Sequence, residues 1–159
     1  MTAIEKLEAL YALLPKVQCQ RKCQRYCGPI LMTRMEASRL EQKRGYLNLV
    51  PAGEIAKRAY LPTAALVVET CVGIVPDPRE QYCPFLGPFP LGQCMAYSIR
   101  PLVCRAWGTM NNEQMRCPHG CVPERWLTNE EFRSYNLQAI AIQKEWEAER
   151  AAHASKSST

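Results

Sequence analysis

The chain has 159 residues, of which 47% are hydrophobic and 22% are charged, and its formal net charge is +5. This composition excludes a disordered chain, and the length predicts one domain without room for a large second one. The apolar runs are too short to span a bilayer, and acidic residues near the start disfavour a signal peptide. We therefore expect a cytoplasmic protein that does not bind membranes.

The first third of the chain predicts two helices. Apolar residues recur at helical spacing over 3–14, and Pro15 ends the pattern. Thr33 and Glu36 form the Thr-x-x-Glu pattern of a capping box, which predicts a short helix that reaches about Gly45.

The middle of the chain predicts little regular structure. The largely β-branched run 65–75 favours a buried strand, although a helix is also compatible with it, and 54–59 is weakly helical. Five prolines within 76–94 favour only a hairpin-like turn between Cys83 and Cys94. Ordering such a segment costs about 1–2 kcal/mol per residue, so we expect a bound metal or a cross-link to fix it.

The end of the chain predicts a third helix. Residues 128–131 form another capping box, from which an amphipathic helix is expected over about 129–151. A disordered tail is expected at 153–159. The predicted fold is a single metal-stabilised domain over 1–152, mainly α, with an irregular cysteine-rich centre and a small β-hairpin.

Cysteine is the strongest functional signal. The chain has nine cysteines but one aspartate and two histidines, and no HExxH, Walker A or GxGxxG motif. An odd number of cysteines without an export signal disfavours a full disulfide framework and favours metal binding. In an unbroken helix Cys19 and Cys27 would lie about 12 Å apart, too far for one zinc ion. Either this segment bends around one centre, or its cysteines divide between two.

Three motifs resemble the bacterial CxxxCxxCC cysteine-cluster family (YkgJ-like), described as zinc- or iron-chelating domains. Cys19-x3-Cys23-x2-Tyr26-Cys27 follows its first motif, residues 29–36 the next segment, and residues 83–105 its C-x-f-L…C-x-i-Y-x-x-R-P-x-x-C-R block. The resemblance covers about 19–121 and implies a metal-binding core there.

The chain departs from this family at Tyr26, where a cysteine is usual, so one ligand of the usual set is missing. Cys121, Cys71 and His119 are the candidates to replace it. Cys71 lies in an apolar run without a family match, which favours a buried structural thiol. His119 lies two residues from each neighbouring cysteine, which favours a turn residue.

We predict that eight thiolates hold the metal. Their negative charge would be offset by Arg100 and Arg105, which bracket Cys104 and could donate hydrogen bonds to sulfur. The alternative is that both arginines are solvated. The predicted ligands are Cys19, Cys23, Cys27, Cys83, Cys94, Cys104, Cys117 and Cys121.

The predicted function is metal binding in an accessory, delivery or sensing role. An iron–sulfur cluster and zinc both accept four thiolates, and we lean slightly to iron. One alternative is a metal-cluster-dependent enzyme related to protein lysine N-methylases, which the resemblance implies. Another is a nucleic-acid-binding zinc module, because 16–44 is rich in lysine and arginine, although a solvated face explains that charge better. The sequence specifies neither a protein partner nor an oligomeric state.

Overall fold

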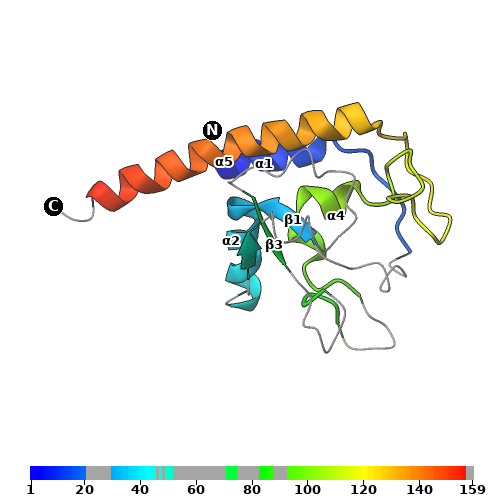
Figure 1. Cartoon of the computed structure of the whole chain (residues 1–159), viewed down its shortest axis with the longest axis horizontal. Helices are drawn as coiled ribbons and strands as arrows, with labels where there is room; N and C mark the ends of the chain where they lie inside the picture. Colours follow the sequence, from blue (N-terminus) through cyan, green and yellow to red (C-terminus); the bar gives the residue numbers. More distant parts are fainter. Residues whose placement is uncertain are drawn as a thin grey trace.

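The computed structural model of the chain describes residues 1–20, 30–45, 47, 49–51, 71–74, 83–87 and 93–156. It is a mainly helical single domain with a small sheet (Figure 1). Its elements are α1 (Ala3–Ala12), β1 (Ile30–Thr33), α2 (Arg34–Arg44), β2 (Leu49–Pro51), β3 (Cys71–Ile74), the 3-10 helix η3 (Tyr97–Ile99), α4 (Leu102–Ala106) and α5 (Asn129–Lys156).

The helices α1 and α5 lie side by side and run in opposite directions (Figure 1). Their contact is fixed at both ends, because Ala3 N–H donates to Glu149 Oε1 at 3.1 Å and Tyr135 Oη donates to the Leu13 carbonyl at 3.4 Å. The apolar side chains of the two helices, together with residues of α2, α4 and the α4–α5 loop, form the first hydrophobic core, which includes Leu7. The helix predicted over 3–14 is therefore confirmed.

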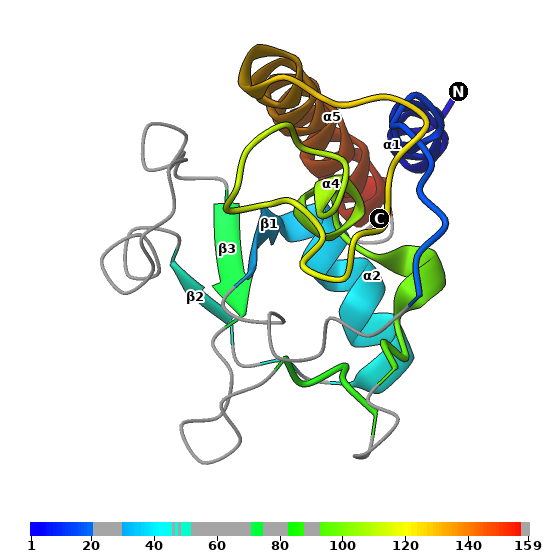
Figure 2. The same cartoon turned by 90° about the vertical axis from the view of Figure 1, so that its right-hand side faces the viewer.

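The sheet has three antiparallel strands in the order β1-β3-β2. Ile30 and Leu49 both pair with Ile74, so β3 is the central strand. Val72, on β3, is 4% exposed and belongs to a second hydrophobic core with Leu40 of α2. Figure 2 shows the sheet on one side of α2, with α5 near the end at which α2 begins.

The predicted strand over 65–75 is confirmed at 71–74, whereas 65–70 and the weak helix at 54–59 lie outside the described residues. Leu86 and Cys94 form a short antiparallel pairing where the hairpin-like turn was predicted, whereas 88–92 between them lie outside the described residues. Around it, Gly87 N–H donates to the Gln93 carbonyl at 2.9 Å. The three-stranded sheet is larger than the predicted β element. The additional strands were not predicted, because strands of three or four residues are too short to show periodicity.

The two predicted capping boxes are present. Thr33 Oγ1 accepts from Glu36 N–H at 3.3 Å, and Thr128 Oγ1 accepts from Glu131 N–H at 3.1 Å. The last helix continues to Lys156, so residues 153–156, assigned to a tail from sequence, are helical. Alanines are strong helix formers, and His153 and Lys156 in the last turn suit the negative end of the helix dipole. No helix in the described ranges is both long and apolar enough to cross a membrane.

Candidate metal centre

The loop between α4 and α5 carries two of the predicted ligands, and backbone hydrogen bonds hold it in shape. Leu127 N–H donates to the Thr109 carbonyl at 2.8 Å, and Asn111 N–H donates back to the Leu127 carbonyl at 2.9 Å. Gly108 adopts a φ of 85°, which disfavours any side chain, and a Cβ there would begin 3.5 Å from that of Cys117. The loop therefore approaches its own start closely at Cys117.

This loop also pairs with the segment that follows α1. Val17 and Pro123 form an antiparallel bridge, and Glu124 N–H donates to the Lys16 carbonyl at 2.9 Å. Both cartoon views show the two segments next to each other (Figures 1 and 2). The pairing brings Cys19 to the same region as Cys121, although about a hundred residues separate them in sequence.

Cys117 and Cys121 form a hydrogen-bonded pair of thiols. Burial alone would raise the pKa of Cys117, but the backbone N–H groups of His119 and Cys121 and the Cys121 thiol donate to its sulfur and lower that pKa. The intervening turn has Gly120 at a φ of 73°, with its N–H donating to the Cys117 carbonyl at 3.3 Å. Cys117 is therefore the thiol of this pair that loses its proton first.

Cys121 has the opposite tendency. The backbone N–H of Gln20 donates to its sulfur and lowers its pKa, but burial, the hydrogen bond to Cys117 and the charges of Cys117 and Cys19 outweigh this and raise that pKa. The Cys121 side chain is buried, and the His119 side chain is exposed. His119 thus contributes its backbone N–H to this site.

Two further predicted ligands lie in the second hydrophobic core. Cys83 is buried there and Cys94 packs against the same core. Cys104 is half-buried on α4. The described cysteines therefore fall into two sets, one around the α4–α5 loop and one around the short hairpin, with Cys104 on the helix between these segments in the chain.

The remaining cysteines are less well placed. Cys23 and Cys27 lie outside the described residues, and Cys71 is known only from its backbone position on β3, opposite Thr33. The six cysteines whose side chains are described are thiols rather than disulfide halves. Among the described residues, no three or more histidine, cysteine, aspartate or glutamate side chains form a group that could hold a metal ion.

In the described part of the chain, Arg100 and Arg105 donate to backbone carbonyls. Arg100 Nε donates to the Tyr97 carbonyl at 3.1 Å and its Nη1 to the Cys104 carbonyl at 3.4 Å. Arg105 Nε donates to the Arg100 carbonyl at 2.7 Å, and its guanidinium lies 4.2 Å from the centre of the Tyr11 ring. Both arginines brace the backbone around Cys104, and they bring positive charge close to it.

Sequence reasoning missed the backbone donors of this site. The Cys-Pro-His-Gly-Cys spacing contains a signal for them, because a glycine at the fourth position permits the tight turn that aims N–H groups back at the first sulfur. The Gln20 donor has no local signal, since it depends on the pairing of two distant segments. A cavity of about 340 Å³ lies beside Cys117 and is lined in part by Trp107 and Arg116, so this thiol is accessible from solvent.

Comparison of the chain with protein-family models, with curated proteins and with solved structures finds no match in any of the three. The resemblance to the cysteine-cluster family therefore stays a prediction that depends on the motifs themselves.

Proposed function

We propose that this chain is a metal-binding cysteine-cluster protein and that Cys117 and Cys121 are two of its ligands. The carrying observation is the set of backbone N–H groups directed at these two sulfurs. Thiolate is the form of cysteine that binds metal, and hydrogen bonds to sulfur stabilise it. A pair of thiols with a purely structural role would not need such donors.

The other ligands of this centre would come from the segment that starts at Cys19. This residue already acts electrostatically on Cys121, and Cys23 and Cys27 follow it in sequence. Zinc and iron–sulfur centres commonly take four thiolates, so two or more cysteines of this segment would complete the set. The chain would then bend after Cys19, because a straight helix would carry Cys27 out of reach.

Cys83, Cys94 and Cys104 are the remaining proposed ligands. Two centres of four thiolates each would use all eight predicted ligands, the N-terminal cluster being shared between them. Bound metal would supply the cross-link that the proline-rich middle of the chain needs. We favour an accessory, delivery or sensing role, with iron slightly preferred over zinc.

Metal content of the protein purified without oxygen tests this proposal. We expect bound metal, with a broad visible absorption band if it is an iron–sulfur cluster and no colour if it is zinc. Cys117→Ser and Cys121→Ser should each lower the ratio of metal to protein. Cys71→Val is the matched control, since it removes a cysteine that we do not assign as a ligand, and it should keep the wild-type ratio.

Two results would contradict the proposal. One is wild-type protein that is folded and free of metal. The other is a metal content that Cys117→Ser and Cys121→Ser leave unchanged.

A further inference from the structure

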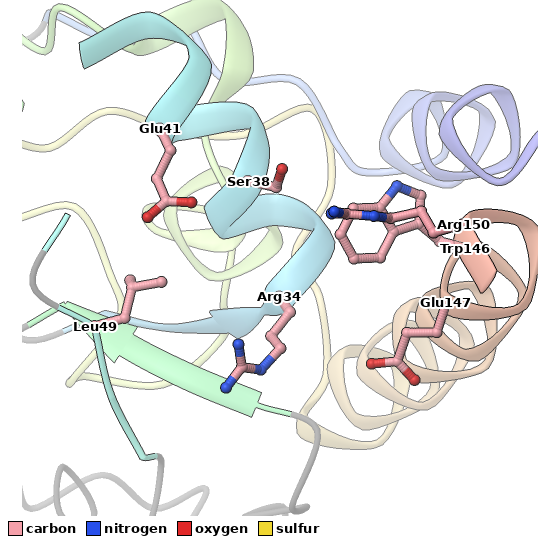
Figure 3. Close-up of a pocket in the computed structure, with 7 residues that line it drawn as sticks. All are labelled: Arg34, Ser38, Glu41, Leu49, Trp146, Glu147 and Arg150. Carbon is pink, nitrogen blue, oxygen red and sulfur yellow. The ribbon is translucent and has the colours of Figure 1, made fainter. Parts of the chain in front are cut away.

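Two adjoining cavities lie between α2 and α5, well away from the α4–α5 loop (Figure 3). Their volumes are about 330 and 340 Å³, and they share Ser38, Trp146 and Arg150 as lining residues. Along α2 the lining residues Arg34, Ser38 and Gln42 recur every fourth position. Together the cavities form a groove about 12 Å long, counted along the helix, which we call the α2–α5 groove.

Three arginines line the groove. Arg39 pairs with Glu8 through Nη2, but its Nη1 is buried and has no hydrogen-bond partner in the described structure. Arg34 and Arg150 are exposed and make no ion pair with any described residue. The two exposed guanidinium groups are therefore open to an acidic ligand, whereas Arg39 Nη1 is enclosed by the fold.

The remaining side chains shape this surface. The Arg150 guanidinium lies 4.7 Å from the centre of the Trp146 ring, and Figure 3 shows the stacked pair directed toward α2. Glu41 and Glu147 also line the groove, and Glu147 accepts a hydrogen bond from Gln143 at 2.6 Å. These carboxylates would repel a continuous polyanion such as a nucleic-acid backbone. A peptide with separated carboxylates would be repelled less, because each carboxylate can pair with one arginine.

We propose that the α2–α5 groove binds an acidic peptide segment of a partner protein. An extended chain advances about 3.3 Å per residue, so roughly four residues span the groove, and carboxylates on alternate residues meet successive arginines. Arginine and carboxylate form charge-assisted hydrogen bonds, which the exposed guanidinium groups of Arg34 and Arg150 can supply. This proposal goes beyond metal binding and does not depend on it.

The test is fluorescence anisotropy of a labelled peptide of alternating glutamate and serine, titrated with the full chain. The double variant Arg34→Gln/Arg150→Gln should weaken binding at least about tenfold, because it removes two charge-assisted contacts. Arg133→Gln/Lys144→Gln removes the same charge from exposed positions on α5 outside the groove and should leave affinity within about twofold. Arg39→Lys keeps a cation for Glu8 and removes only a buried group, so it should change the affinity little.

Several results would overturn the proposal. Equal losses in the two double variants would show unspecific attraction to positive charge. Equal binding of a glutamine–serine peptide would show that carboxylates are not recognised. Displacement by inorganic phosphate at the peptide's own concentration would indicate a small-anion site, and tighter binding of a single-stranded oligonucleotide that depends on Arg34 and Arg150 would indicate nucleic acid. Unchanged melting temperatures of the variants exclude misfolding as the cause.

Discussion

The Glu36 carboxylate joins four segments of the fold and is 3% exposed. Its Oε1 accepts from Tyr11 Oη at 2.6 Å and from Leu102 N–H at 2.7 Å, while its Oε2 accepts from Thr33 N–H at 2.8 Å. Burial, followed by the charge and the hydrogen bond of Glu36, raises the pKa of Tyr11, which keeps the phenol protonated as a donor. One side chain thus ties α1 and α4 to the start of α2.

Replacement of this carboxylate should be costly. In Glu36→Gln an amide NH₂ replaces one of the two carboxylate oxygens and cannot accept the hydrogen bonds that this oxygen accepts. We therefore expect the free energy of unfolding to fall by about 1–3 kcal/mol. Glu41 lies on the same helix, and its side chain accepts no hydrogen bond in the described structure. Glu41→Gln should therefore change the free energy of unfolding by less than about 0.5 kcal/mol. Urea unfolding followed by circular dichroism measures both, and equal effects of the two substitutions would contradict this account of Glu36.

The two thiols of the candidate metal centre should ionise at different pH. The pKa of Cys117 is lowered and that of Cys121 is raised, so in metal-free, reduced protein the thiolate fraction at a given pH is larger at Cys117. Only the thiolate reacts with iodoacetamide, and Cys117 should therefore be alkylated at lower pH than Cys121. Peptide mass spectrometry after short alkylation pulses across a pH series resolves the two sites.

The unfolded chain is the control for this measurement. In urea the backbone donors are lost, so both thiols should titrate together near the value of an ordinary cysteine. Alkylation of Cys121 before Cys117 in the folded protein would contradict the arrangement of donors described above.

Among the helices, the contact of α5 with the start of α2 depends on a buried amide. Gln143 is fully buried; its Oε1 accepts from Met35 N–H at 2.7 Å and its Nε2 donates to Glu147. Met35 lies in the first turn of α2, where backbone N–H groups have no partner within the helix. The side chain of one helix therefore caps the other.

Loss of this cap should destabilise the packing of α5. Gln143→Leu keeps similar volume but leaves the Met35 N–H buried without an acceptor, which should lower the free energy of unfolding by about 1–3 kcal/mol. Gln138→Leu is the matched control, since Gln138 is exposed on the same helix. Thermal and urea unfolding should show the loss only for Gln143→Leu, and a stabilised Gln143→Leu protein would refute this role.

Helix starts were the part of the fold that local sequence could predict, whereas the end of α5 was placed too early. The capping boxes at Thr33 and Thr128 mark helix starts because the side chain and the backbone donors that it satisfies lie within four residues. The strands β1 and β2 carry no such mark, since their pairing with β3 depends on residues about 20 to 45 positions away. Gln143 was not predicted either, because a glutamine that faces inward looks locally like a break in the apolar stripe.

For the candidate site too, local sequence patterns were predictable and contacts between distant segments were not. Cysteine spacing identified Cys117 and Cys121, but it could not indicate which of the other cysteines lies near them. That information resides in the pairing of residues 16–17 with 123–124, which brings Cys19 near Cys121. Arg100 and Arg105 were predicted to donate to the Cys104 sulfur, and the hydrogen bonds seen in the described structure go to carbonyl oxygens, which only the geometry of this turn reveals.

For the molecule as a whole, the central claim is that thiolates distant in sequence share bound metal. Native mass spectrometry of protein purified without oxygen tests it most directly, when followed by denaturation and alkylation of the same sample. We predict a native mass that exceeds the chain by bound metal, which denaturation releases to leave nine alkylated cysteines. A metal-free native mass that lacks two hydrogens for each disulfide, with correspondingly fewer alkylated cysteines, would contradict the claim.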